Sequence, residues 1–300
     1  MDRTQLITTA ELTKEEVNFF INEAEDLRGK RTNDLKGKIV ASLFYEPSTR
    51  TRMSFESAAH RLGAKVITVA DIESSSVSKG ETLGDTISVI EKYADIIVMR
   101  HPWEGSAEEA CKHTKKPFIN AGNGASQHPT QALLDAYTIN KEMGRIDGLT
   151  MAFVGDLKFG RTVHSLLHVL KLYNVKKLLF ISPDQLKIPQ EYLDLLKEKN
   201  IEYLEDTDLE KYIPEIDVLY MTRIQKERFE NKEEYEALKG SYILTSDIVK
   251  MGKPEMRVMH PLPRVDEIST DVDGMEQAAY FRQAENGIYM RMALLKNLVL

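Results

Sequence analysis

Short apolar runs alternate along the chain with longer segments whose apolar residues recur at helical spacing. The apolar runs occur at residues 38–44, 66–69, 95–99, 117–120, 150–154, 177–181, 217–221 and 257–259. Their length and composition are typical of strands that are buried on both faces. The segments with helical spacing lie at residues 14–24, 55–62, 86–93, 130–144, 162–173 and 286–300. This alternation predicts an α/β fold with parallel sheets.

The strand-and-helix pattern begins again near residue 150, which predicts a second domain. We therefore expect two doubly wound parallel-sheet domains joined by interdomain helices. The first domain should comprise residues 1–132 together with the C-terminal helix, residues 286–300, and the second should comprise residues 133–285. The length of 300 residues and the hydrophobic content of 42% are sufficient for two such cores.

Hydroxyl and guanidinium groups are concentrated between one predicted strand and the helix after it. The sequence Pro-Ser-Thr-Arg-Thr-Arg at residues 47–52 follows the strand at 38–44. The free N–H groups at a helix start and the positive end of the helix dipole favour an anion. Arg50 adds a planar fork that fits phosphate oxygens. We predict a site for a phosphate ester or anhydride, and the alternative is a simple helix cap by Ser48 or Thr49.

Other polar residues stand at the ends of predicted strands. Arg100 and His101 end one strand, and His128 and Gln131 lie where another strand gives way to a helix. Open α/β sheets bind ligands at the carboxyl ends of their strands, so these residues are candidates for ligand contacts. The alternative for His128 and Gln131 is a structural role in capping the helix.

A polar segment at residues 73–81 shows no periodicity and is predicted to be a loop. One interpretation is a solvated linker. The other is a flap that carries Ser76 and Lys79 to an anion.

Charge and cysteine content exclude several classes of protein. The net charge of −7 argues against a nucleic-acid partner or an anionic membrane surface, so an anionic substrate must be attracted by a local basic cluster. The single cysteine, Cys111, excludes an internal disulfide and a zinc site built from cysteines. No apolar run approaches the roughly 20 residues that cross a bilayer, and residues 1–5 lack the apolar core of a signal peptide. We expect a cytoplasmic protein.

Two apparent motifs have better structural explanations. Residues 155–162 nearly fit the phosphate loop of nucleotide hydrolases, but Arg161 stands where the motif requires lysine, and no second acidic strand for magnesium follows. His164 and His168 are four residues apart on a predicted helix, but no third ligand has suitable spacing. We expect them to be packed helix residues.

Six short motifs occur in order over essentially the whole chain. They are Ser48-Thr49-Arg50-Thr51-Arg52, Arg100-His101-Pro102, His128-Pro129-Thr130-Gln131, Gly160-Arg161-Thr162, Arg223-Ile224-Gln225 and His260-Pro261-Leu262-Pro263-Arg264. Together they resemble the aspartate/ornithine carbamoyltransferase family, and the set is far more specific than any one motif. Within the family the resemblance is to the catalytic chains of the aspartate enzymes.

The ornithine enzymes are the close alternative within this family. They usually have His-Cys-Leu-Pro where this chain has His-Pro-Leu-Pro at residues 260–263. They must also accept a cationic side chain, whereas Lys79, Arg161 and Arg223 match positions that hold a dicarboxylate in the aspartate enzymes. A positive cluster repels ornithine, so charge and motif both favour aspartate.

The resemblance implies carbamoyl phosphate and L-aspartate as substrates, and it implies neither a cofactor nor a metal. The implied ligands of carbamoyl phosphate are Ser48, Thr49, Arg50, Thr51, Ser76, Lys79, Arg100, His128, Gln131, Pro261, Leu262 and Pro263. Catalytic roles are implied for Arg50, Thr51, Arg100, His128 and Gln131, and aspartate binding for Lys79, Arg161, Arg223 and Gln225. Ser75 is the alternative to Ser76, because the flap is one residue shorter than in some relatives.

The resemblance also implies a homotrimer in which the flap of one chain completes the active site of its neighbour. The implied reaction gives N-carbamoyl-L-aspartate and phosphate, the committed step of de novo pyrimidine biosynthesis. It proceeds by direct attack of the amine, with stabilisation of the developing oxyanion and closure of the two domains. Some members of the family join zinc-bearing regulatory chains, and the sequence leaves that partner open. An anion-binding scaffold without catalysis is the alternative from a different functional class.

Overall fold

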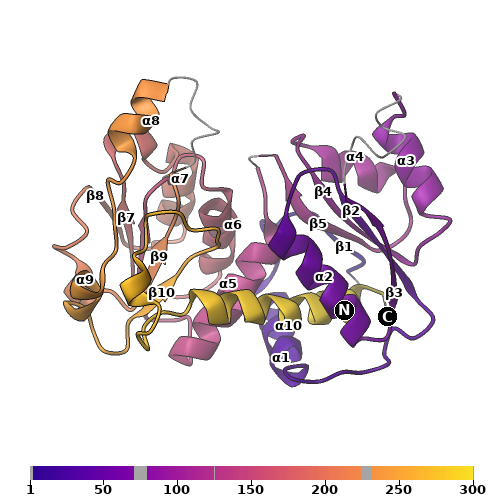
Figure 1. Ribbon diagram of the computed structural model, residues 1–300, viewed down its shortest axis with the longest axis horizontal. Coiled ribbons are helices and arrows are strands. Elements are labelled where there is room, and N and C mark those ends of the chain that lie inside the picture. Colours follow the sequence, from indigo (N-terminus) through magenta and orange to yellow (C-terminus); the bar gives the residue numbers. More distant parts are fainter. Residues whose placement is uncertain (1–2, 71–79, 125, 225–231, 300) are drawn as a thin grey trace. The chain divides into compact units, whose positions relative to one another are not determined.

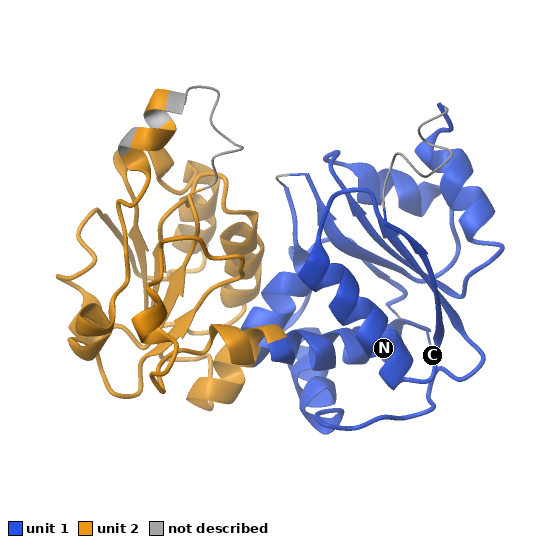
Figure 2. Ribbon diagram, viewed as in Figure 1, with its two compact units in different colours: residues 1–137, 285–300 blue, residues 138–284 orange. Residues whose placement is uncertain are grey.

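The structure is a computed structural model that describes residues 3–70, 80–124, 126–224 and 232–299. The chain forms two compact units (Figure 2). Unit 1 consists of residues 1–137 and 285–300, and unit 2 consists of residues 138–284. Each unit contains one parallel sheet with flanking helices (Figure 1).

The sheet of unit 1 has five parallel strands in the order β1-β5-β4-β2-β3. The strands are β1 (Gln5–Leu6), β2 (Ile39–Phe44), β3 (Lys65–Val69), β4 (Ile96–His101) and β5 (Phe118–Asn123). After β3 the chain crosses to the other side of β2 to form β4, so the sheet reverses its winding direction between β2 and β4. The carboxyl ends of the two strands at such a reversal form the usual ligand crevice of open α/β sheets.

The helices of unit 1 bury one apolar stripe each. They are α1 (Lys14–Asp26), α2 (Thr49–Arg61), α3 (Leu83–Ile90), α4 (Ser106–Lys112), the first part of α5 (Pro129–Met143) and most of α10 (Tyr280–Val299). A capping box between Thr13 and Glu16 begins α1. In α2, Phe55, Ala58 and Ala59 are buried, and full burial of a side chain such as Phe55 contributes roughly 1.5–3 kcal/mol.

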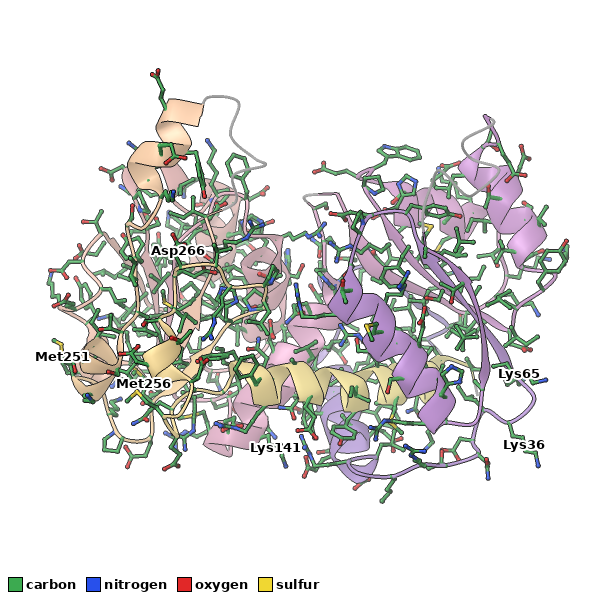
Figure 3. The ribbon with its side chains drawn as sticks, viewed as in Figure 1. Lys36, Lys65, Lys141, Met251, Met256 and Asp266 are labelled. Carbon is green, nitrogen blue, oxygen red and sulfur yellow. The ribbon has the colours of Figure 1, made fainter. Side chains whose placement is uncertain are left out.

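Unit 2 repeats the architecture with a parallel sheet in the order β10-β9-β6-β7-β8. Its strands are β6 (Thr150–Val154), β7 (Lys177–Ile181), β8 (Tyr203–Asp206), β9 (Val218–Met221) and β10 (Arg257–Met259), and its helices include α6 (Arg161–Leu170), α7 (Gln190–Glu198), α8 (Lys232–Leu238) and α9 (Ser246–Lys250). Here the winding reverses between β6 and β9. Met256, labelled in Figure 3, is fully buried in the core of this unit, whereas Met251 nearby in the sequence is 48% exposed.

The predicted α/β architecture of two doubly wound parallel sheets is confirmed, and the predicted strand positions agree closely with the observed ones. The sequence patterns missed two edge strands. β8 has no fully buried residue, and β1 is only two residues long, so neither carries an apolar run. The C-terminal helix begins at Tyr280, earlier than the predicted start at Asn286. The pattern missed the first turns because they include exposed residues such as Phe281, which interrupt the buried face of the helix.

Both predicted domain boundaries lie inside helices. The chain passes from unit 1 to unit 2 within α5 and returns within α10. Within the described residues, no helix combines the length and the apolar composition that crossing a bilayer requires.

Candidate active site

The first part of the candidate site lies at the winding reversal of unit 1. Phe44 at the end of β2 pairs with Arg100 in β4, which brings the segment after β2 beside the Arg100 side chain. Nη1 of Arg100 donates to the hydroxyl of Ser48 over 3.3 Å. Ser48 occupies the N-cap position of α2, but its side chain makes no capping hydrogen bond. The alternative that Ser48 is a simple helix cap is therefore wrong.

Arg100 is a buried cation that is held in place from two sides. Only 8% of the residue is exposed, and its Nε donates to Glu46 Oε2 over 3.1 Å. The main chain adds a third link, because the N–H of Tyr45 donates to the carbonyl of Arg100 over 2.9 Å. A guanidinium fixed in this way adds a positive charge to the start of α2 with little conformational freedom left to lose.

The hydroxyl and guanidinium residues of the predicted anion site occupy the first turn of α2. Thr49, Arg50 and Thr51 are the first three residues of the helix. Thr51 is buried, whereas Thr49 and Arg50 are exposed. The exposed side chains and the first helical N–H groups form the kind of surface that binds phosphate.

His128 comes close to Arg100 across a glycine at the end of β5. Gly122 has a φ of 123°, and a Cβ atom built on it would lie 3.7 Å from Cδ2 of His128 and 3.8 Å from Nη1 of Arg100. His128 is 5% exposed. The imidazole and the guanidinium thus both lie within van der Waals distance of one point beside Gly122, as expected for residues that share a ligand.

Two buried asparagines shape the loop that carries His128. Nδ2 of Asn120 donates to the carbonyl of Ile7 over 2.8 Å and to Oδ1 of Asn123 over 3.2 Å. The same Oδ1 accepts the N–H of Gln127 over 3.2 Å. Sequence analysis gave Asn120 no role, although an amide that ends an apolar run was a usable signal, because a buried amide needs partners.

Gln131 lies in the first turn of α5, three residues after His128. Its backbone N–H donates to the carbonyl of His128 over 3.0 Å, and its side-chain Nε2 donates to Oδ1 of Asp135 over 2.8 Å. The side chains of Gln131 and Asp135 are both buried. Ser48, Arg100, His128 and Gln131, which were predicted from separate motifs, thus belong to the carboxyl-terminal side of one sheet in unit 1.

The second part of the candidate site lies at the winding reversal of unit 2. Gly155 follows β6 with a φ of 113°, and a Cβ atom there would lie 2.4 Å from the carbonyl oxygen of Thr222, just after β9. A Cβ on Gly160 would lie 2.6 Å from the carbonyl oxygen of Asp156. The two glycines of the apparent nucleotide motif are thus explained by close backbone approach. The loop ends at Arg161, the first residue of α6, and Arg223 follows Thr222.

Buried side chains fix the loop that leads to Arg161. Oδ1 of Asp156 accepts the N–H of Phe159 over 2.9 Å, and Nε2 of His164 lies 2.8 Å from the carbonyl oxygen of Leu157. The His164 ring stacks on Tyr192 with ring centres 4.3 Å apart. Burial lowers the pKa of His164 to about 4, so the ring is neutral near pH 7 and donates from Nε2. His164 is a packed helix residue, as predicted.

The segment after β10 is held by a buried histidine and glutamate. Nε2 of His260 lies 2.6 Å from Oε1 of Glu267, and Nδ1 of His260 accepts the N–H of Leu262 over 2.7 Å. Leu262 has a φ of 56°, a conformation that costs a non-glycine residue about 1–2 kcal/mol. Burial raises the pKa of Glu267, but the hydrogen bond from His260 and those from the surrounding backbone N–H groups outweigh it, so the pKa is lowered.

The remaining predicted site residues divide into two groups. Pro261 and Leu262 are partly exposed and Pro263 is exposed, so all three are accessible in unit 2. Ser76, Lys79 and Gln225 lie outside the described residues. Among the described residues, no group of three or more histidine, cysteine, aspartate or glutamate side chains has the arrangement of a metal site.

Two family models match the chain and together cover nearly all of it. Residues 4–141 match the model described as "Aspartate/ornithine carbamoyltransferase, carbamoyl-P binding domain". Residues 147–298 match the model described as "Aspartate/ornithine carbamoyltransferase, Asp/Orn binding domain".

Similar proteins of the same length carry names from this family. The chain is 54% identical over 299 residues to the aspartate carbamoyltransferase catalytic subunit of Methanocaldococcus jannaschii, covering 98% of this chain and 97% of that protein. It is 50% identical over 300 residues to the corresponding subunit of Archaeoglobus fulgidus, covering 98% and 99%.

Solved structures show the same similarity. The catalytic subunit of M. jannaschii aspartate transcarbamoylase in an orthorhombic crystal form matches with a TM-score of 0.92 at 52% identity, covering 99% of this chain and 98% of that one. Aspartate transcarbamoylase from Trypanosoma cruzi, in complex with carbamoyl phosphate and aspartate, matches with a TM-score of 0.92 at 40% identity, covering 97% and 95%.

Proposed function

The chain belongs to the aspartate/ornithine carbamoyltransferase family, and on that premise we propose that it transfers the carbamoyl group of carbamoyl phosphate to the amine of L-aspartate. The products are N-carbamoyl-L-aspartate and phosphate. The geometric observation that carries the proposal is the buried Arg100, which contacts Ser48 and lies near His128 at the winding reversal of unit 1. The full-length relatives named as aspartate carbamoyltransferases support the choice of aspartate.

The phosphate of carbamoyl phosphate binds at the start of α2. Arg50 and Arg100 supply charge, and Ser48, Thr49 and Thr51 supply hydroxyl donors. Support comes from the exposure of Thr49 and Arg50 and from the hydroxyl of Ser48, which is not used as a helix cap. The first N–H groups of α2 and its dipole add to the attraction for a dianion.

Thr51, Arg100 and His128 surround the carbonyl oxygen of the carbamoyl group. Negative charge grows on this oxygen as the amine attacks, and donors already held in place stabilise it without reorganising. The two-sided anchoring of Arg100 supports this role, because it fixes the cation before substrate binds. Gln131 and the backbone carbonyls of Pro261 and Leu262 bind the amide nitrogen of the carbamoyl group, and Pro263 completes that segment.

Unit 2 binds the two carboxylates of aspartate through Arg161 and Arg223. Support comes from their placement at the carboxyl ends of β6 and β9, where the winding of that sheet reverses. Gln225 and Lys79 complete this set. The fixed loop between Gly155 and Arg161 positions the first of the two arginines.

The reaction is a direct displacement. The neutral amine of aspartate attacks the carbonyl carbon, a C–N bond forms, and the bond from that carbon to the phosphate oxygen breaks. The electron pair of the broken bond leaves with phosphate, which also accepts the proton released by the amine. Binding both substrates in line removes an entropic barrier of up to about 7–11 kcal/mol, and closure of the two domains excludes water.

Ornithine is the competing amine within the family. Its cationic side chain would have to lie against Arg161 and Arg223, and two like charges in one pocket disfavour binding. Aspartate offers the opposite charge. The comparison of these two amines in one assay therefore tests the substrate assignment directly.

The proposal extends to assembly and to metabolism. A homotrimer lets the flap that carries Ser76 and Lys79 complete the site of the neighbouring chain, with Ser75 as the alternative ligand to Ser76. The reaction supplies carbamoyl aspartate for pyrimidine biosynthesis in the cytoplasm. A zinc-bearing regulatory chain is a further partner to test by mixing experiments.

An assay with carbamoyl phosphate and L-aspartate, with L-ornithine in parallel, tests the function. Arg100→Ala should lower kcat by about 100- to 1,000-fold because it removes a donor to the developing oxyanion, whereas Arg223→Ala should mainly raise KM for aspartate. Arg145→Ala is a surface control that should change neither. Wild-type protein that forms no carbamoyl aspartate would overturn the function, and wild-type kinetics in both active-site variants would overturn the assigned roles.

A further inference from the structure

A buried carboxylate contacts the side-chain amide of Gln131 in unit 1. Asp135 is fully buried on α5, and its Oδ1 accepts the Nε2–H of Gln131 over 2.8 Å. The two residues are four apart, so they lie on the same face of the helix one turn from each other. The NH₂ end of the Gln131 amide therefore faces Asp135, whose carboxylate oxygens act as acceptors. The carbonyl oxygen of Gln131 is then left for another partner.

A buried arginine on α10 supplies the counter-charge to Asp135. Arg291 is 3% exposed, and the Asp135 carboxylate acts to raise its pKa. Its Cζ lies 5.1 Å from the centre of the Phe55 ring on α2. Burial lowers the pKa of Arg291 to about 10, which still leaves the guanidinium charged near pH 7.

The helix sequence makes room for this guanidinium. A Cβ atom on Gly287 would lie 2.4 Å from Nη1 of Arg291 and 3.2 Å from Cδ2 of Leu134. Gly287 is in the interior of α10, where glycine is less favourable than alanine. A poor helix former thus stands where the Arg291 head group needs space.

Stability alone is a weak explanation for the buried pair. The cost of removing two charges from water cancels most or all of their attraction, so a buried ion pair is often no more stable than apolar residues of the same size. Asp135 contacts the amide of a proposed substrate ligand, which suggests a role in orienting that amide.

We propose that Asp135, together with Arg291, fixes the amide of Gln131 so that its carbonyl oxygen accepts a hydrogen bond from the NH₂ group of the transferred carbamoyl. Asp135 and Arg291 are positioning residues in this proposal, which rests on the proposed function. The consequence is selectivity: an oxygen acceptor recognises the NH₂ of carbamoyl phosphate and finds no donor in the methyl group of acetyl phosphate.

The test compares dissociation constants for carbamoyl phosphate, acetyl phosphate and inorganic phosphate in the full chain by titration calorimetry. Asp135→Asn can donate as well as accept, so Gln131 is no longer held in one orientation. We expect the affinity for carbamoyl phosphate to fall about tenfold, the size of one hydrogen bond, while the affinities for the other two ligands stay unchanged. A general structural defect would weaken all three ligands together.

The chain offers a matched control. Nε2 of Gln190 donates to Oδ1 of Asp194 over 2.8 Å with the same four-residue spacing, but on the exposed surface of α7. Asp194→Asn should leave all three affinities and the activity unchanged.

A second variant covers the case in which Asp135→Asn does not fold because it leaves the Arg291 charge buried alone. The double variant Asp135→Asn/Arg291→Met removes both charges, and it should fold and show the same selective loss. Wild-type selectivity in either folded variant would overturn the proposal. So would failure of the double variant to fold, because the pair would then be structural. The proposed function is judged separately, by carbamoyl aspartate formation in the wild type.

Discussion

At the scale of single residues, the structure explains which polar side chains act as scaffolding and which stay available. His260 accepts the N–H of Leu262 at Nδ1, so its other nitrogen, Nε2, carries the proton and donates to Glu267. Glu267 in turn accepts the N–H groups of Val265 and Asp266. This pair holds the left-handed Leu262, whose carbonyl is proposed to contact the carbamoyl group.

Glu267→Gln tests the scaffolding role. The substitution weakens a charge-assisted hydrogen bond in a buried site, so we expect the free energy of unfolding to fall by about 1–3 kcal/mol, measured by urea titration at pH 7. The lowered pKa of Glu267 in the folded chain means that its contribution is present above the unfolded pKa and is lost as the pH falls through the folded pKa. The variant should therefore lose less stability than the wild type on acidification.

The control for this prediction is an exposed glutamate in the same unit. The Glu276 side chain is 81% exposed and lies 3.1 Å from Arg257. Glu276→Gln should change the free energy of unfolding by less than about 0.5 kcal/mol. It should also lose stability on acidification to the same extent as the wild type. Equal acid sensitivity of wild type and Glu267→Gln would contradict the role assigned to Glu267.

At the scale of elements, the candidate site depends on where strands end. In both sheets, site residues lie at the carboxyl ends of the two strands at which the winding reverses, β2 and β4 in unit 1 and β6 and β9 in unit 2. Further site residues follow β5 in unit 1 and β10 in unit 2. The sequence patterns located these strands because each is a buried apolar run. They did not reveal that β2 and β4 are neighbours, since strand order is set by long-range pairing that a local pattern does not encode.

Gly155→Ala tests the close approach of β6 and β9. Its φ of 113° and the distance of 2.4 Å from a Cβ to the Thr222 carbonyl oxygen both oppose a side chain. We expect a loss of at least about 2 kcal/mol in unfolding free energy, together with a raised KM for aspartate, because the Arg161 and Arg223 loops are displaced.

Gly148→Ala separates the effect of backbone strain from the effect of a steric clash. Gly148 has a φ of 74° but no atom within 4 Å of a Cβ, so its substitution introduces backbone strain without a clash. It should cost only about 1 kcal/mol and leave KM for aspartate unchanged. Equal effects of the two substitutions would mean that the close approach is unimportant.

At the scale of the whole molecule, composition and pattern predicted two α/β sheets, and motif resemblance predicted most of the candidate site. Ser48, Arg100 and His128 were identified from separate motifs, and the structure places them near one another within unit 1. Asp135 and Arg291 were missed. They lie far apart in the sequence on two helices, and an isolated charge in a helix is normally solvent-exposed, so only the burial in the structure distinguishes them.

Leu295→Ala tests how α10 supports unit 1. Leu295 is fully buried, and such a truncation typically costs about 2–5 kcal/mol. Hydrogen exchange should accelerate in β2 and β4, which belong to the same unit, more than in β6 and β7 of unit 2. Val265→Ala, at a position 70% exposed, is the control and should change neither pattern. Equal acceleration in both units would show that they open together.

The return of the chain to unit 1 through residues 285–300 has a consequence for synthesis on the ribosome. At about 5–20 residues per second, the ribosome needs on the order of ten seconds to make unit 2 after residue 137, and throughout that interval the N-terminal sheet lacks its last helix. Asp135 gains the nearby charge of Arg291 only after unit 2 has been made. The nascent N-terminal half is therefore exposed to chaperones and proteases for longer than its position in the sequence suggests.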